Sequence, residues 1–259
     1  MTLTYLNLLL GLLLVLVPAY LVYTYDRLLL SKATLSVVRM LVQLLVMGAC
    51  LWAVFHFGWF WLCLLWLLLL VVAAAFLVVS RTHILSRVLF LPACVGMFSS
   101  VAIVGAYVLL VVLQPADPLN ARWFVPVTGV LMAHLLPTSI RAIRTFYDSL
   151  TQDSQPYYTL SGNGASRLHA LAPYITRTLR SMVLPATANL SAMGLFVMPM
   201  LLSGLLMGGL SPLQAMLSFV ILIFASITAS ILSVAITLCL SCRHAFNRQG
   251  QILQVFTAD

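Results

Sequence analysis

Apolar stretches long enough to cross a membrane recur along nearly the whole chain, separated by short polar segments. A helix needs about 20 apolar residues to span the hydrocarbon core, and it satisfies its own backbone hydrogen bonds there. The pattern predicts an all-α polytopic membrane protein with about seven transmembrane helices. The expected spans lie near residues 3–23, 36–55, 59–79, 88–113, 123–140, 182–208 and 214–240.

Basic residues fix an orientation for these spans. If the polar segments are assigned alternately to two sides, all but one of the 13 Lys and Arg residues fall on one side, and Arg122 alone falls on the other. Lys and Arg mark the cytoplasmic side of membrane proteins. We therefore expect the N-terminus outside and the C-terminus inside. The residues on the cytoplasmic side are Arg27, Lys32, Arg39, Arg81, Arg87, Arg141, Arg144, Arg167, Arg177, Arg180, Arg243 and Arg248.

Composition excludes a soluble protein. The chain is 63% hydrophobic and 7% charged, whereas soluble domains carry about 25% charged residues. The net charge of +8 is explained by topology and by anionic lipid headgroups, so no nucleic-acid partner is expected. The longest polar segment is too short for a core of its own, which predicts a single transmembrane domain over residues 1–259.

Two absences limit how the chain could be energised. It has no glycine-rich phosphate-binding loop followed by Lys, so we expect no ATP hydrolysis and no cofactor in this chain. It has no glutamate, and its five aspartates lie outside the apolar stretches. Ion-coupled carriers usually place carboxylates inside the membrane. Any transport by this chain is therefore expected to draw its energy from elsewhere.

Polar residues inside the fifth and seventh spans mark a candidate translocation path. His134 interrupts an otherwise apolar span, where it is either a functional residue or one partner of an interhelical hydrogen bond. In the seventh span, hydroxyl side chains spaced 4, 3 and 4 residues apart share one helix face. That stripe forms either a packing seam or the wall of a polar path. It consists of Ser226, Ser230, Ser233 and Thr237.

The sixth span adds small and polar residues to this candidate path. Gly204 and Gly208 form a small-residue packing motif, and Asn189, Ser191 and Met198 are further candidates for the path. Methionine can bind soft metals, although it more often fills gaps at mobile interfaces. The single Cys-x-x-Cys at 239–242 is weak evidence for zinc, so the sequence assigns no metal ligand.

The segment 146–181 is large enough to bind a soluble partner. It reads as a helix to about Leu160, a Gly- and Asn-rich turn, and a second helix that leads into the sixth span. Tyr157 and Tyr158 are candidate aromatic anchors for a partner. The alternative is a solvated loop whose arginines only set topology.

The chain resembles the bacterial iron-export ABC permease family of the FetB type, whose plant relatives are aluminium-sensitivity proteins. The resemblance covers most of residues 30–245 and includes Arg39-x-x-x-Gln43-Leu44. The other matching motifs are Val-Pro-Val-Thr-Gly at 125–129, Leu-Ser-x-x-Gly-Ala-Ser at 160–166, Leu-Pro at 184–185, Met-Gly-Leu at 193–195, Met-Pro at 198–199, Leu-Leu-Ser-Gly-Leu-Leu at 201–206 and Gly-Leu-Ser-Pro-Leu-Gln-Ala at 209–215.

The resemblance implies a multi-pass permease of the bacterial inner membrane that exports metal as a homodimer. A separate ABC ATPase subunit would bind ATP and Mg²⁺. Two other hypotheses are a membrane scaffold or lipid-interaction protein without transport, and an uncoupled channel. The resemblance also implies that residues 160–166, within the segment 146–181, belong to the coupling element that docks on the ATPase. To these residues we add the two tyrosines and the following arginine. The expected coupling residues are Tyr157, Tyr158, Leu160, Ser161, Gly162, Asn163, Gly164, Ala165, Ser166 and Arg167.

Overall fold

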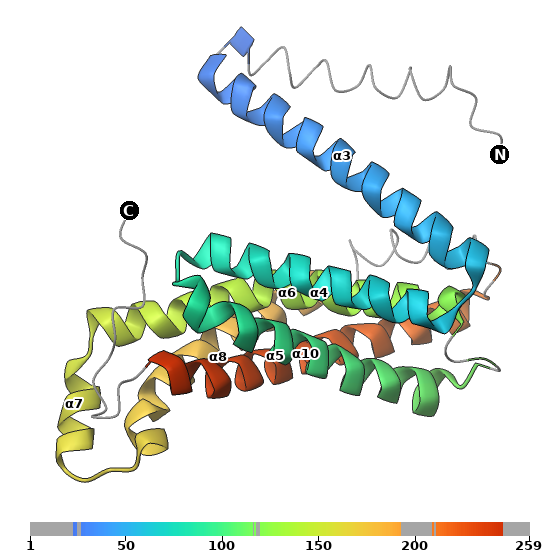
Figure 1. Ribbon diagram of the computed structural model, residues 1–259. Coiled ribbons are helices and arrows are strands. Elements are labelled where there is room, and N and C mark those ends of the chain that lie inside the picture. Colours follow the sequence, from blue (N-terminus) through green and yellow to red (C-terminus); the bar gives the residue numbers. More distant parts are fainter. Residues whose placement is uncertain are drawn as a thin grey trace. The chain divides into compact units, whose positions relative to one another are not determined.

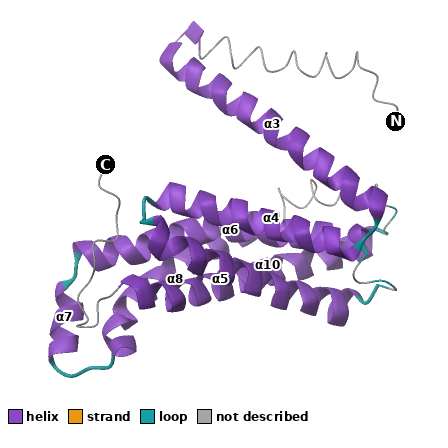
Figure 2. Ribbon diagram, in the orientation of Figure 1, coloured by secondary structure: helices purple, strands orange, loops and turns teal. Residues whose placement is uncertain are grey.

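The computed structural model describes residues 23–24, 27–115, 117, 120–192, 209 and 211–245. Every regular element in these ranges is helical (Figure 2), which confirms the all-α prediction for this part of the chain. The chain divides into two compact units, residues 1–57 and residues 58–259.

The first unit contains α3 (Arg27–Phe57), a continuous helix of 31 residues. Its segment Thr34–Phe57 is long and apolar enough to cross a membrane, and 6% of its most apolar window is buried. The helix includes the whole of the expected second span. The expected first span, 3–23, lies outside the described residues apart from Tyr23.

The second unit is a helix bundle built from α4 (Phe60–Thr82), α5 (Ser86–Tyr107), α6 (Ala121–Gln152) and α10 (Pro212–Ala245). A short π-helix, η1 (Val108–Leu113), extends α5. Helix α10 packs along α5 and α6, while α4 packs against the same two helices from another side (Figure 1). Each helix buries one face in this core and leaves apolar side chains on the other, as expected for helices in lipid.

Four segments of this bundle qualify as membrane spans: Phe60–Thr82, Val88–Leu113, Ala121–Gln152 and Pro212–Arg243. Together with α3 they account for five of the seven expected spans. The second half of the expected sixth span lies outside the described residues, because α8 (Arg167–Ala192) is described only to Ala192.

The connection from α6 to α8 forms a helical hairpin beyond one end of the bundle (Figure 1). The prediction of one helix running to about Leu160 is wrong, because α6 ends at Gln152 and α7 (Gln155–Gly162) begins after a break at Asp153 and Ser154. Pro156 lies in the first turn of α7, where a missing N–H costs no helical hydrogen bond. Gly164, with a φ of +82°, turns the chain toward α8.

Two contacts hold α10 in place. At Gly96 of α5 the two helices approach so closely that a Cβ atom would lie 2.8 Å from the Ser233 carbonyl oxygen and would also overlap the Thr237 hydroxyl. Close approach at a small residue is a common way for membrane helices to associate. Further along the helix, the buried Tyr147 hydroxyl of α6 lies 2.8 Å from the Ser241 hydroxyl.

Candidate functional site

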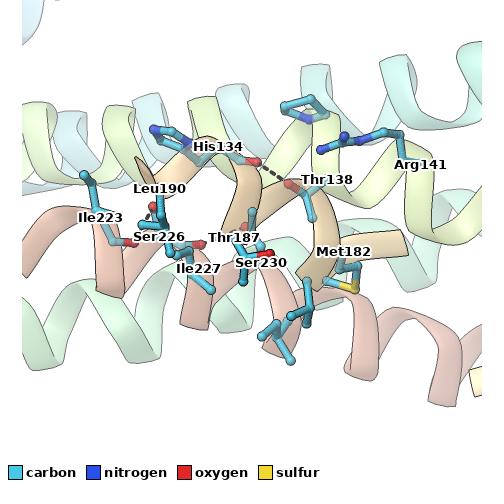
Figure 3. Close-up of a pocket in the computed structure, with 14 residues that line it drawn as sticks. His134, Thr138, Arg141, Met182, Thr187, Leu190, Ile223, Ser226, Ile227 and Ser230 are labelled. Atoms are coloured by element: carbon cyan, nitrogen blue, oxygen red, sulfur yellow. Dashed lines mark hydrogen bonds between the residues drawn. The ribbon is translucent and has the colours of Figure 1, made fainter. Parts of the chain in front are cut away.

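A cavity of about 200 Å³ lies between α6, α8 and α10. Its wall is mostly aliphatic, with Leu190, Ile223 and Ile227 among the lining residues. Figure 3 shows the polar side chains of all three helices gathered around this space. They are His134, Thr138 and Arg141 from α6, Thr187 from α8, and Ser226 and Ser230 from α10.

Helical periodicity explains why the three polar residues of α6 meet at the cavity. His134, Thr138 and Arg141 are spaced 4 and 3 residues apart, so they share one face of the helix. Pro137, which also lines the cavity, lacks a backbone N–H and cannot complete the helical hydrogen bond to residue 133. The half-buried His134 imidazole and the exposed Arg141 guanidinium both lie on this face.

The four hydroxyl groups of the cavity donate to carbonyl oxygens of their own helices. Thr138 Oγ1 lies 3.0 Å from the His134 carbonyl oxygen, and Thr187 Oγ1 lies 2.9 Å from that of Leu184. On α10, Ser226 Oγ and Ser230 Oγ lie 2.8 and 2.7 Å from the carbonyl oxygens of Ile223 and Ser226. Since a hydroxyl has one proton and two lone pairs, these groups can act as acceptors toward a ligand.

Among the described residues that line the cavity, Arg141 is the one formally charged side chain and none carries a carboxylate. The ion pairs that the structure describes lie further along the chain, between Arg144 and Asp148 at 3.5 Å and between Arg177 and Asp153 at 3.2 Å. Arg141 forms no ion pair with any residue in the described ranges. The electrostatic character of the cavity is therefore positive.

The hydroxyl stripe of α10 divides between two environments. Ser226 and Ser230 line the cavity, whereas Ser233 and Thr237 lie at the contact with Gly96 of α5. Ser233 is fully buried, and its hydroxyl has no hydrogen-bond partner in the part of the chain that the structure describes. The first two residues could therefore touch a ligand in the cavity, and the last two belong to a packing seam.

The remaining predicted path residues have no described side-chain environment. Asn189 and Ser191 belong to α8, but their side chains lie outside the described set, and Met198 lies outside the described residues altogether. Within the described ranges, no group of three or more His, Cys, Asp or Glu side chains could hold a metal ion.

The hairpin separates the two predicted aromatic anchors. Tyr157 is 2% exposed and belongs to the hydrophobic core, together with Leu150, Ala170 and Tyr174. Tyr158 is 46% exposed. Tyr157 cannot reach a partner while α7 remains folded, so Tyr158 is the tyrosine available for a contact.

The predicted turn is accessible around Tyr158. Residues 161–164 and Ser166 are exposed, while Leu160 and Ala165 are half-buried and the Arg167 side chain lies outside the described set. Leu168, at the start of α8, is 75% exposed. The hairpin therefore presents an aromatic ring, an aliphatic side chain and short polar residues at its tip.

Asp153 ties the break between α6 and α7 to α8. Its carbonyl oxygen accepts a 2.5 Å hydrogen bond from the Tyr174 hydroxyl, and its carboxylate pairs with Arg177. Burial raises the pKa of the Tyr174 phenol above its usual value, so the hydroxyl keeps its proton and its donor role. These two contacts join the break between α6 and α7 to α8.

Sequence reasoning missed four residues of these two sites. Thr138 and Arg141 could have been found from their spacing to His134, because residues 4 and 7 positions apart share a helix face. Thr187 belongs to the cavity only because α8 packs against α6. The sequence did not indicate a role for Leu168, which is simply an apolar residue beside a polar turn.

Comparison with known proteins identifies relatives whose similarity to this protein extends over most of the chain. The model of an uncharacterised protein family, UPF0014, matches residues 5–246. A UPF0014 membrane protein of Synechocystis sp. is 26% identical over 215 residues, which cover 83% of each chain. The probable iron export permease protein FetB of Escherichia coli is 26% identical, over 93% of this chain and 92% of the relative.

A plant relative completes the pattern. The Arabidopsis thaliana protein ALUMINUM SENSITIVE 3 is 25% identical, over 96% of this chain and 90% of the relative. These matches confirm the resemblance inferred from the sequence motifs. No solved structure matches the chain.

Proposed function

The chain belongs to the UPF0014 family of membrane proteins, and on this basis we propose that it is the membrane-spanning subunit of an ABC transporter. A separate subunit would bind and hydrolyse ATP, and the transporter would export a small substrate. The name of the Escherichia coli relative, a probable iron export permease, supports the direction of transport and a metal-related substrate. The proposal places the chain in the inner membrane of a bacterium.

One structural observation carries this proposal: the helices that hold the exposed hairpin are also helices that line the cavity. Helix α6 supplies His134, Thr138 and Arg141 to the cavity and leads into α7. Helix α8 supplies Thr187 and begins at the hairpin turn. A partner that moves the hairpin would therefore move two of the three cavity walls.

The proposed mechanism follows from these connections. Nucleotide-driven closure of two ATPase subunits would displace α7, and the contacts of Asp153 with Tyr174 and Arg177 would pass this displacement to α8. The cavity would then open alternately to the two sides of the membrane. A homodimer of this chain would provide two such hairpins for two ATPase subunits.

ATP turnover of the reconstituted complex tests the proposal. The chain is co-expressed with a candidate ABC ATPase subunit, and the complex is purified and placed in lipid. We expect the chain alone to hydrolyse no ATP above background, and the complex to hydrolyse ATP faster than the isolated ATPase. An ATPase that neither co-purifies nor responds to the chain would favour a scaffold or an uncoupled channel.

Reporter fusions test the proposed orientation, with the hairpin in the cytoplasm. Fusions at Gly58, Asp117 and Ser211 are expected to report outside, and fusions at Thr82, Asp153 and Phe256 inside, because the basic residues gather on one side. Alkaline phosphatase and green fluorescent protein fusions read the two sides independently. An inside signal at Asp117 would contradict the seven-span topology.

A further inference from the structure

We propose that the cavity between α6, α8 and α10 binds a small anion, and that the transported substrate is accordingly anionic and not a bare metal cation. The anion could be a free organic acid or a metal already enclosed in a negatively charged complex. Both ligands would present carboxylate groups to the cavity, and titration with citrate and with ferric citrate distinguishes between them. The claim about the transported substrate rests on the proposed transport function. The claim that the cavity binds an anion does not depend on that function.

Charge is the first reason. Arg141 lines the cavity as a permanent cation, and the part of the lining that the structure describes contains no carboxylate. Asp148 and Asp153, the acidic residues next along the chain, are already paired with Arg144 and Arg177. A bare divalent cation would meet repulsion without a counter-charge, whereas an anion would find a charged donor without a competing partner among the described residues.

Hydrogen-bonding capacity is the second reason. A guanidinium presents donors in a planar fork that fits a carboxylate. The hydroxyls of Thr138, Ser226 and Ser230 use their protons within their own helices, so their oxygens can accept hydrogen bonds from a ligand. His134 can donate or accept through its ring nitrogens. An anion that also carries hydroxyl groups would satisfy both kinds of partner.

The aliphatic part of the wall is the third reason. Leu190, Ile223 and Ile227 offer nothing to replace the water shell of a small hard cation. They suit the carbon skeleton of an organic anion. A volume of about 200 Å³ has room for a small organic molecule together with a few waters.

A soft-metal site is the strongest competing interpretation. The cavity holds one imidazole, from His134, and one thioether, from Met182. Soft metals in proteins favour thiolate, thioether and imidazole ligands, and no cysteine is among the described residues that line the cavity. One imidazole and one thioether are fewer ligands than a closed metal site uses, and the charge of the neighbouring Arg141 repels a cation.

Binding measurements on the purified chain test this inference without any ATPase. The chain is placed in phosphatidylcholine nanodiscs and titrated calorimetrically with citrate, with ferric citrate and with anaerobic ferrous chloride. We expect saturable binding of citrate, of ferric citrate or of both, and no saturable binding of ferrous ion. Binding of ferric citrate alone would identify an anionic metal complex, and binding of free citrate would identify the organic anion.

Matched substitutions on α6 locate the site. Arg141→Gln is expected to weaken anion binding at least tenfold, and Arg141→Lys to weaken it less because the charge remains. Arg144→Gln, three residues further on and paired with Asp148 outside the cavity, should change the affinity less than twofold. Circular dichroism spectra of each variant serve as the control for folding. We expect the Arg141 variants to remain folded because the Arg141 side chain is exposed.

Four results would overturn the inference. The first is saturable binding of ferrous ion that persists or becomes stronger in the Arg141→Gln variant, and the second is anion binding that this substitution leaves unchanged. The third is that the unmodified chain shows no saturable anion binding. The fourth is that citrate binding is lost when the nanodiscs contain phosphatidylglycerol. The last result would make Arg141 a contact for lipid headgroups.

ATP turnover of the complex tests the proposed transport function independently of the anion site. Anion binding without any effect of the chain on ATP turnover would uphold the site and refute the transporter. Turnover stimulated by ferrous ion but by neither citrate nor ferric citrate would uphold the transporter and refute the anionic substrate.

Discussion

Replacing Gly96 with alanine is expected to destabilise the folded protein by about 1–3 kcal/mol, the usual cost of overpacking a well-packed interface. The added methyl group would lie 2.8 Å from the Ser233 carbonyl oxygen and 3.1 Å from the Thr237 backbone nitrogen. Both atoms belong to the α10 backbone, which cannot turn aside as a flexible side chain can. Helices α5 and α10 must separate to accept the change.

Gly105 of the same helix is the matched control. A Cβ atom there would meet Leu131 Cδ1 at 3.7 Å, an ordinary van der Waals distance. Alanine favours a helix over glycine by about 1 kcal/mol, so Gly105→Ala is expected to be neutral or stabilising. The same substitution at two positions of α5 should therefore have opposite signs.

Thermal unfolding in detergent measures both variants. A loss of 1–3 kcal/mol corresponds to a decrease of about 2–12 °C in the midpoint for a protein of this size. Membrane proteins often unfold irreversibly, so the midpoints are compared at one scan rate. An unchanged or higher midpoint for Gly96→Ala would show that α5 and α10 do not approach this closely.

Replacing the exposed pair Tyr158 and Leu168 with alanine is expected to abolish stimulation of the partner ATPase while leaving the chain folded. Tyr158 is 46% exposed and Leu168 is 75% exposed, so truncating them creates no internal cavity. Central aromatic side chains at interfaces often contribute about 2 kcal/mol or more, and their loss would weaken association about thirtyfold. Co-purification and ATP turnover of the complex measure the effect.

Tyr157→Ala serves as the contrasting variant. Its ring is 2% exposed within the core, and removing a buried aromatic ring costs about 3–5 kcal/mol. We expect this variant to lose thermal stability, and to lose coupling as a consequence.

If the variant with alanine at both Tyr158 and Leu168 still stimulated ATP turnover, the hairpin tip would not be the docking surface.

The sequence by itself determined the elements of this protein that depend on local chemistry. Hydropathy alone located five spans that the structure describes as long apolar helices, because burial in lipid requires each to be apolar over its whole length. Glycine and asparagine at 162–164 located the hairpin turn, because such residues favour turns, and Gly164 adopts a φ of +82° there. Motif order was sufficient to identify the family.

Tertiary structure alone decided which faces of these helices meet. Tyr157 and Tyr158 are chemically alike and adjacent, yet one is buried and one exposed, because α7 packs against α8 on one side. The hydroxyl stripe of α10 is uniform in sequence, but α5 covers Ser233 and Thr237 while a cavity faces Ser226 and Ser230. Helical periodicity places residues on a common face, whereas the neighbour that covers this face comes from distant parts of the chain.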